Sequence, residues 1–328
     1  MTPLDAAQAL SRSRRPLVLG IGGGGDVVGA LATAEHARLA HGAEPVVGGV
    51  SWERRPIDPL PGPRSVDEIE GGRALAPCVL AASADTRVRT SGVRFAESHL
   101  AGLTGRETVL VDPTPGPAAV SEALATAADA LGADLTVFVD VGGDALAHGD
   151  EPGLASPLCD AVMLAAAGRL QASGRAVLGG VFGAGCDGEL TLDELEARFA
   201  EIGAAGGLAG AVGIGPAVAE LLERAVAIVP TEASAQAVRA FRGSAGTVEI
   251  RQGRRTLRLS PAAALTVYFD VAVAIGSAAR LVSAVDGAGS LAEANDALRA
   301  MGLRTELDYE LRAAAAASPT DSADSSRR

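Results

Sequence analysis

Short apolar runs that end in glycine or aspartate alternate with longer helical patterns along most of this chain. The alternation is typical of β-α-β units, in which parallel strands form a sheet and the connecting helices cover its two faces. We therefore expect an α/β fold of the Rossmann-like, doubly wound type with a mostly parallel sheet. Strands are predicted at 16–21, 45–50, 77–81, 107–111, 135–139, 175–182 and 207–213. Helices are predicted at 26–41, 117–131, 157–172, 191–202, 215–226 and 231–242.

Two regions in the last third of the chain depart from this alternation. Residues 247–259, TVEIRQGRRTLRL, alternate polar and apolar side chains on both sides of Gln252 and Gly253. This pattern predicts an antiparallel β-hairpin that is added to the sheet and carries its arginines on the outer face. Residues 261–282 are strongly apolar but contain charged side chains, which indicates a buried helix rather than a membrane span.

The domain organisation follows from what separates these segments. No stretch has the composition of a linker that would split the chain, so we expect one α/β domain over residues 1–313. Residues 314–328 are small, polar and rich in alanine, which predicts a disordered tail.

Composition excludes several classes of function. All 28 basic residues are arginine, so lysine Schiff-base chemistry and the lysine-containing phosphate loop are excluded. A net charge of -12 argues against a nucleic-acid partner, because such a partner needs a basic surface. The three cysteines are widely spaced, and the N-terminal segment lacks the apolar region of a secretory signal. We expect a cytoplasmic protein with a small-molecule ligand and no membrane contact, and the formation of homo-oligomers stays open.

A glycine-rich loop follows the first predicted strand in the stretch LGIGGGGDVVGA. The spacing of Gly20, Gly22 and Gly25 fits the dinucleotide-binding fingerprint, which requires this position between a strand and a helix. We expect the backbone N–H groups of this loop to bind the anionic part of a ligand. Its ligand-binding residues would be Gly22, Gly23, Gly24 and Gly25. The acidic residue that would support a nicotinamide cofactor, Glu53, comes later than usual and precedes two arginines.

Asp26 stands directly behind the glycines, where a bare phosphate would favour positive charge. A carboxylate at the start of a helix can act as an ordinary cap for free N–H groups. Alternatively, it binds a metal, a hydroxyl or an ammonium group while the glycines bind the anionic part of the same ligand.

The same arrangement recurs after the fifth predicted strand, where Gly142 and Gly143 precede Asp144. Loops that follow parallel strands emerge at one edge of the sheet, so we expect Asp26 and Asp144 to share a site as catalytic residues. Asp140 would lie beside them. Like charges gathered there need compensation, and Mg²⁺ held by Asp26 and Asp144 together with ligand phosphates would supply it.

Further candidates come from the long loop at 142–156 and from the segment after the third predicted strand. His148 and Glu151 lie in that loop and are predicted to contact the ligand. Arg87 and Arg89 would supply counter-charge to a phosphate or carboxylate. For Asp112 and Asp187, which also follow strands, ordinary turn chemistry is an equal alternative. Cys186 is interpreted as a small buried residue.

The motifs GIGGGGDVVGA, VDVGGDAL and EPGLASPLCDAVML together resemble the family called domain of unknown function 1152, over about residues 15–312. This resemblance implies no particular activity. Residues 19–29 are also similar to the GDGGNE-x-G-M-G loop of D-glutamate cyclases, although Asp26 replaces asparagine and a second Gly-Met-Gly is missing. That similarity implies lyase or cyclase chemistry on an amino-acid-like substrate.

The sequence thus favours an enzyme, a hydrolase or lyase acting on a small anionic metabolite or nucleotide, in which one carboxylate activates water or removes a proton. The alternative is a non-catalytic nucleotide or metabolite sensor. A nicotinamide-dependent oxidoreductase is the third reading, and only Glu53 supports it.

Overall fold

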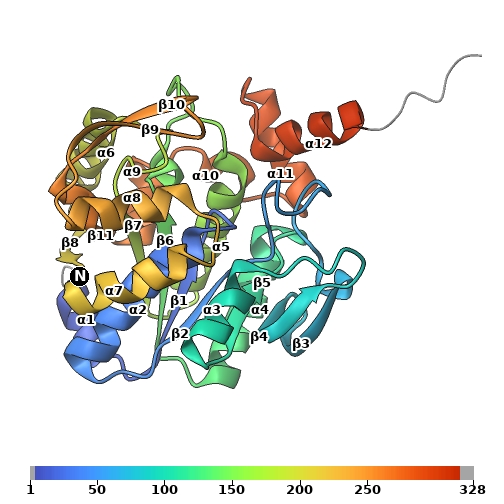
Figure 1. The fold of residues 1–328 in the computed structure, drawn as a ribbon, viewed down its shortest axis with the longest axis horizontal. Coiled ribbons are helices and arrows are strands. Elements are labelled where there is room, and N and C mark those ends of the chain that lie inside the picture. Colours follow the sequence, from blue (N-terminus) through green and yellow to red (C-terminus); the bar gives the residue numbers. More distant parts are fainter. Residues whose placement is uncertain (1–3, 318–328) are drawn as a thin grey trace, which may run out of the picture.

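The computed structural model describes residues 4–317 and confirms the α/β class. Its main sheet has nine strands in the order β3-β4-β5-β2-β1-β6-β7-β11-β8 (Figure 1). The strands that supply the predicted parallel core are β1 (Pro16–Gly20), β2 (Val46–Val50), β5 (Thr108–Val111), β6 (Leu135–Val141) and β7 (Val177–Phe182). The flanking strands are β3 (Ile69–Ala76), β4 (Val79–Val88), β8 (Leu208–Gly213) and β11 (Leu265–Phe269).

The chain reverses its direction of travel across the sheet between β1 and β6. It runs outward from β1 through β2 to β5, then returns to the other side of β1 and continues through β6 to β7. Val18 of β1 is in parallel register with Val47 on one side and with Val137 on the other. In such sheets the crevice at the carboxyl ends of the two diverging strands is where ligands bind.

Antiparallel strands extend this core at both edges. β4 pairs antiparallel with β5 and β3, and β11 pairs antiparallel with β7 and β8. The five core strands are buried along their whole length, which is why they appear in the sequence as continuous apolar runs rather than alternating ones.

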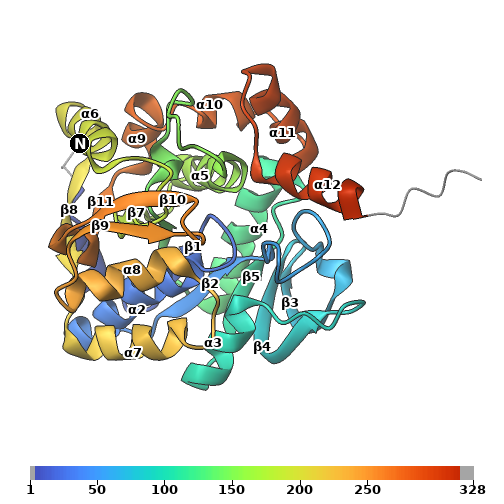
Figure 2. The same ribbon diagram turned by 45° about the horizontal axis from the view of Figure 1, so that its top comes forward.

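Helices cover both faces of the sheet (Figure 2). One face carries α1 (Ala6–Arg12), α2 (Asp26–His41), α3 (Ala96–Thr104), α7 (Pro216–Val226) and α8 (Glu232–Phe241). The other face carries α4 (Gly116–Leu131), α5 (Pro157–Ala172), α9 (Val271–Ser277), α10 (Val282–Val285) and α11 (Leu291–Ala300). α6 (Leu192–Ala204) packs against α9 and β8, and α12 (Glu306–Ala317) contacts α5. The short 3₁₀ turns are η1 (Val66–Glu68), η2 (Asp144–Leu146) and η3 (Pro261–Ala264).

The predicted hairpin is present as β9 (Gly246–Ile250) and β10 (Arg255–Leu259), but these strands form a two-stranded sheet of their own. The expectation that its arginines all face outward is wrong for Arg255, which donates to the carbonyl of Asp187. Arg258, on the same strand, is exposed as expected.

The apolar segment 261–282 is not the single buried helix that its composition predicts. It forms η3, the strand β11, α9 and the start of α10. Asp270 ends the strand and begins α9, where its side chain accepts a hydrogen bond from the N–H of Val273. Short apolar runs fit buried strands and buried helices equally well, so periodicity does not separate the two.

The end of the chain also differs from expectation. Helix α12 continues to Ala317, so residues 314–317 of the expected tail are helical. Residues 318–328, the remainder of that tail, lie outside the described residues. No helix within residues 4–317 is long and apolar enough to cross a membrane.

Candidate functional site

Six carboxyl groups converge at the carboxyl edge of the sheet, where the connections that follow the neighbouring strands β1 and β6 lead in opposite directions. They form two groups, and within each group one possible ligand oxygen per residue lies within 4.8 Å of the other two. The first trio consists of Asp26, Asp140 and Asp160. The second trio consists of Asp144, Asp187 and Glu189. Asp140 lies near the end of β6, and Asp26 and Asp144 begin α2 and η2. Asp187 and Glu189 follow β7, and Asp160 lies in the first turn of α5.

The glycine loop before Asp26 satisfies its own N–H groups in part. Asp26 Oδ2 accepts a hydrogen bond of 2.9 Å from the N–H of Gly22, and the N–H of Gly24 donates to the carbonyl of Trp52 at 2.9 Å. Gly23 has a φ of 83°, and a Cβ there would also approach that carbonyl. Two of the N–H groups that were expected to bind an anion, those of Gly22 and Gly24, thus donate hydrogen bonds within the protein. Asp26 is the acceptor for one of them.

In the first trio, Asp140 and Asp160 are deeply buried, Asp26 is partly buried, and the hydrogen bonding is incomplete. Asp140 is 1 % exposed; its Oδ2 accepts from the N–H of Ala145, and its Oδ1 has no partner among the described residues. Asp160 is 2 % exposed, and its Oδ1 also has no partner there. A Cβ on Gly22 would lie 2.6 Å from Asp26 Oδ2 and 3.2 Å from both Asp160 oxygens, so only glycine fits between these carboxyl groups.

Burial dominates the electrostatics of the first trio. It raises the pKa of Asp26 to about 7, against the hydrogen bond from Gly22 and the charge of Arg54. Burial, followed by the charge of Asp26, raises the pKa of Asp140 well above its usual value. The pKa of Asp160 is raised well above its usual value by burial and then by Asp140. Three such groups next to one another hold protons or require a cation.

The second trio has its own donors. Glu189 accepts hydrogen bonds from the N–H groups of Ala155 and Ser156 and from the Ser156 hydroxyl, and it forms an ion pair of 3.0 Å with Arg255. Although burial opposes ionisation, Arg255 and these hydrogen bonds lower the pKa of Glu189. Glu189 therefore ties the loop that precedes α5 to the turn after β7.

The two other members of the second trio, Asp187 and Asp144, contact Glu189 and Ser156 respectively. Asp187 Oδ1 accepts from the N–H of Glu189, and burial followed by the charge of Glu189 raises the pKa of Asp187 to about 8. Asp144 Oδ2 lies 3.3 Å from the Ser156 hydroxyl. Burial and then the charge of Asp160 raise the pKa of Asp144 well above its usual value, so the two trios interact.

The second Gly-Gly pair makes room for this arrangement. Gly142 has a φ of 121° and Gly143 a φ of 118°, a backbone region that residues with a Cβ rarely adopt. A Cβ on Gly142 would lie 2.3 Å from Cγ of Asp187. These glycines shape the turn between β6 and η2, and they bring Asp144 and Asp187 together.

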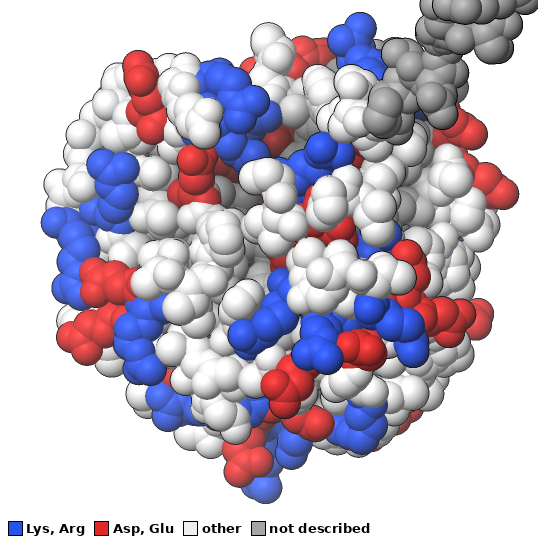
Figure 3. Space-filling view, turned by 45° about the vertical axis from the view of Figure 1, so that its right-hand side comes forward, with Lys and Arg blue, Asp and Glu red and all other residues white. Residues whose placement is uncertain are grey.

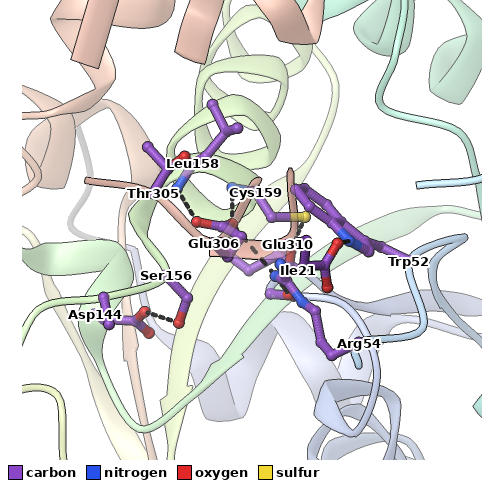
Figure 4. A network of polar contacts seen from close by, with 12 residues as sticks. Ile21, Trp52, Arg54, Asp144, Ser156, Leu158, Cys159, Thr305, Glu306 and Glu310 are labelled. Atoms are coloured by element: carbon purple, nitrogen blue, oxygen red, sulfur yellow. Dashed lines mark hydrogen bonds and ion pairs between the residues drawn. The ribbon is translucent and has the colours of Figure 1, made fainter. Parts of the chain in front are cut away.

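The C-terminal helix α12 reaches into the same region (Figure 4). Glu306 accepts hydrogen bonds from the N–H groups of Leu158 and Cys159 at 3.1 and 2.9 Å, and it forms an ion pair of 3.3 Å with Arg54. Arg54 also donates to the carbonyl of Gly22 and stacks on the Trp52 ring. A carboxylate is thus bound at the N-terminus of α5, in the same helical turn as Asp160 of the first trio.

Comparison with known proteins places the chain in a family. The model of the family described as "Protein of unknown function (DUF1152)" matches residues 17–314. The chain belongs to the DUF1152 family. Among curated proteins and among solved structures, no match was found. The resemblance to domain of unknown function 1152 is therefore confirmed over residues 17–314.

Sequence reasoning grouped Asp26 with Asp144, and the structure places them in neighbouring trios rather than in the same one. It brings Asp140 to Asp26, and it adds Asp160 and Glu189, which the sequence analysis missed. Asp160 carries a usable signal, because it lies in the first turn after the Ser-Pro start of α5, at the same edge of the sheet.

Two predicted ligand residues in the long loop are engaged elsewhere in this family member. His148 lies 3.1 Å from Glu201 of α6 and also contacts Arg198 of that helix. Glu151 accepts hydrogen bonds from the N–H groups of His148 and Gly149, both at 2.8 Å. These contacts close the loop onto α6 and do not join His148 or Glu151 to either trio.

The two predicted arginines lie on the outer part of the sheet. Arg87, at the end of β4, forms an ion pair of 2.7 Å with Glu70 of β3, and its side chain is half exposed. Arg89 contacts the carbonyl of Ile69. Three strand spacings separate β4 from β1, about 14 Å at the usual distance between strands. Arg54 and Arg255, rather than Arg87 and Arg89, are the arginines beside the trios.

A further pair of carboxyl groups lies behind the glycine loop. Glu53 is buried and accepts a hydrogen bond of 2.5 Å from the N–H of Ala96, and burial raises its pKa to about 7. Both oxygens of Glu97 are buried without a partner among the described residues, and a Cβ on Gly49 would lie 2.1 Å from Oε1. Burial and then Glu53 raise the pKa of Glu97 well above its usual value.

Proposed function

We propose that this DUF1152 protein is a hydrolase or lyase that acts on a small anionic metabolite or nucleotide between the carboxyl ends of β1 and β6. The observation that carries this proposal is the convergence of six carboxyl groups from four segments at the point where the chain reverses across the sheet. Burying like charges lowers stability, so an arrangement of this kind is typical of a site maintained for chemistry.

Support for an anionic ligand comes from the contacts of Glu306. Two N–H groups of α5 and the guanidinium of Arg54 already hold a carboxylate there. Helix N-termini and arginine bind phosphate and carboxylate by the same hydrogen bonds. A ligand that carries either group would displace the Glu306 carboxylate from these donors, which lie next to the carboxyl groups of the first trio.

The acid–base chemistry is assigned to the second trio. Ser156 links Asp144 to Glu189 through its hydroxyl, at 3.3 and 2.6 Å respectively. The chain of three groups orients Asp144, which would activate water or remove a proton from the ligand. Asp187 closes the other side of the same turn.

The alternatives have less support. Glu53, the residue that would bind a nicotinamide ribose, is buried against α3. The N–H groups of Gly22 and Gly24 already donate hydrogen bonds within the protein. On the face in Figure 3, arginines are interspersed with acidic side chains, which favours a small ligand over nucleic acid. The three cysteines are free and buried, which fits the reducing cytoplasm as the proposed location.

The test compares the protein with its Asp144→Asn variant in a mixture of cellular metabolites supplied with Mg²⁺. We expect untargeted mass spectrometry to show a phosphate- or carboxylate-containing compound that the protein consumes and the variant does not. Asp129→Asn, an exposed carboxylate on α4, is the matched control and should retain turnover. Tight retention of a compound without turnover would instead identify a sensor.

A further inference from the structure

The first trio has two buried carboxyl oxygens without a hydrogen-bond partner among the described residues, from two different side chains, whereas the second trio has one, Asp187 Oδ2. Asp140 Oδ1 and Asp160 Oδ1 are buried and have no hydrogen-bond partner there, and their side chains are at least 98 % buried. A buried carboxyl oxygen without a partner loses its hydration and gains nothing in return. Two such oxygens in one cluster indicate a group that the protein is built to bind.

We propose that the first trio binds one hard divalent cation of the Mg²⁺ class through Asp26, Asp140 and Asp160. This deepens the proposed function and rests on it for the role of the cation, while binding itself is measurable independently. The ligand set predicted from sequence, Asp26 with Asp144, is thereby revised to three residues of one cluster.

The geometry of the trio fits an ion of this size. Oxygen atoms from the three carboxyl groups lie within 4.8 Å of one another. Metal–oxygen distances of about 2.1 Å for Mg²⁺ and about 2.4 Å for Ca²⁺ place opposite ligands about 4.2 to 4.8 Å apart. The donors are all carboxylate oxygens, with neither a thiolate nor an imidazole in the trio, and this set selects Mg²⁺, Mn²⁺ or Ca²⁺ over zinc.

The other two clusters receive more of their hydrogen bonds and counter-charge from within the protein, although Asp187 Oδ2 of the second trio has no partner among the described residues. In the second trio, Glu189 has Arg255 as its cation and three hydrogen bonds from the loop before α5. In the cluster of His148, Asp150 and Glu151, the Glu151 carboxylate accepts two backbone N–H groups and Asp150 is exposed. Of these three clusters in the described residues, the first trio has the most oxygens without a partner, and the guanidinium beside it, Arg54, is also paired with Glu306.

The position of the cation defines what it would do. Asp160 directly follows Leu158 and Cys159 in the first turn of α5, and the N–H groups of these two residues donate to the carboxylate of Glu306. A cation at Asp160 would therefore adjoin the place where an anionic group is held. Mg²⁺ retains open positions for substrate oxygens when few carboxylates bind it, so the ligand class is a metabolite whose phosphate or carboxylate completes the coordination sphere.

The experiment uses the full chain after removal of metals with EDTA, and the probes are MgCl₂ and MnCl₂ alone. We expect saturable one-to-one binding by calorimetry, together with a rise in the unfolding temperature that increases with cation concentration. Mn²⁺ bound to the protein should show the immobilised signal in electron paramagnetic resonance. Asp160→Asn and Asp140→Asn should each weaken binding by at least about tenfold, because each removes one charged ligand.

Two matched variants control for general effects of charge. Asp187→Asn changes a buried carboxyl group of the second trio, and Asp129→Asn changes an exposed carboxylate that pairs with Arg175. Asp129→Asn should keep the cation affinity within about twofold of the unmodified chain, whereas Asp187→Asn, whose charge acts on Asp140 through the interior, should change the affinity less than Asp160→Asn does. Circular dichroism identifies a variant that fails to fold, and because Asp140 and Asp160 are changed separately, either one suffices for the test.

The outcomes separate the cation from the proposed function. Absence of binding and of any shift in unfolding temperature at millimolar Mg²⁺ and Mn²⁺ would overturn the inference and indicate that the trio is protonated instead. Binding that is unchanged in both Asp140→Asn and Asp160→Asn would overturn it as well. Cation binding without turnover of any compound supports the inference while the proposed function fails. Turnover by a protein that binds neither Mg²⁺ nor Mn²⁺ supports the proposed function while the inference fails.

Discussion

The two trios both consist of carboxyl groups and lie next to each other, yet they differ in the counter-charge and hydrogen-bond donors that surround them. Glu189 in the second trio has an arginine at 3.0 Å and donors from Ala155 and Ser156. The first trio has only Arg54 nearby, and that guanidinium is shared with Glu306 and the carbonyl of Gly22. Buried carboxylates are tolerated where the fold supplies the counter-charge, and where it does not they point to a ligand.

The difference has a topological origin. Arg255 reaches the second trio because the β9–β10 hairpin packs beside the turn after β7. The first trio lies over the diverging ends of β1 and β6, where a ligand rather than a hairpin would be accommodated. The predictions below test this comparison.

The largest effect is expected from Arg255→Leu. The substitution leaves the buried Glu189 carboxylate without its cation, so we expect the free energy of unfolding to fall by about 3 to 4 kcal/mol. Arg258→Leu, on the exposed side of the same strand, should change it by less than about 0.5 kcal/mol. Urea unfolding measures both. Similar losses for the two variants would mean that the ion pair is not what supports the second trio.

The next largest effect is the pH dependence of the unfolding free energy that Glu53 causes. Burial raises the pKa of Glu53 to about 7 from an unfolded value of 4.5, with Asp58 adding to the rise and Arg54 opposing it. A raised carboxyl pKa contributes stability below pH 4.5 that is lost as the pH rises to about 7. The free energy of unfolding should therefore fall over this window by about 2 to 3 kcal/mol on account of Glu53.

Glu53→Gln tests this directly, because the amide oxygen can still accept from Ala96. The variant should reduce the fall of unfolding free energy between pH 4.5 and 7 by the share that Glu53 contributes, about 2 to 3 kcal/mol, whereas Glu44→Gln, at a side chain 82 % exposed, should leave it unchanged. Chemical unfolding at a series of pH values is the measurement. An unaltered slope in Glu53→Gln would show that its carboxyl group is not the source.

Replacing one carboxyl group by an amide should change the stability of the protein in opposite directions in the two trios. In EDTA, Asp160→Asn should stabilise the protein by about 1 kcal/mol, because it replaces a buried carboxyl group that must either take up a proton or carry an uncompensated charge when no cation is bound. Glu189→Gln should destabilise it by about 2 kcal/mol, because Arg255 loses its partner. Thermal unfolding in EDTA distinguishes these directions. Destabilisation by both variants would remove the distinction between the trios.

The smallest effect is expected from Glu306→Gln. The variant removes a charge from the N-terminus of α5, which costs about 0.5 to 1 kcal/mol. It also releases Arg54 toward Asp26 and Asp160, which offsets part of that loss. A net change below about 1 kcal/mol in urea unfolding is the expected result. A loss of several kcal/mol would show that Glu306, not the first trio, is the main partner of Arg54.

Much of the local structure could be predicted from the sequence. The predicted helices at 26–41 and 157–172 have the bounds of α2 and α5, since glycine and Ser-Pro mark their ends. Asp140 and the Gly-Gly turn at 142 were placed at the correct edge because loops after parallel strands must emerge there.

Other members of the site depended on contacts that no local pattern contains. Arg255 and Glu306 lie far along the chain from the residues that they pair with, and both reach the site only through packing. Asp187 had the same local signature as a residue in an ordinary turn. The role of each was decided by its neighbours in space.

The sequence by itself determined the α/β class, most strands and helices of the core, and the edge of the sheet at which the aspartates emerge. Periodicity and turn chemistry act over a few residues, so they are readable without coordinates. Only the tertiary structure decided which carboxyl groups meet and which of them receive a counter-charge. That outcome depends on long-range packing of the hairpin and α12, and electrostatic energies depend on burial and distance, neither of which a linear sequence displays.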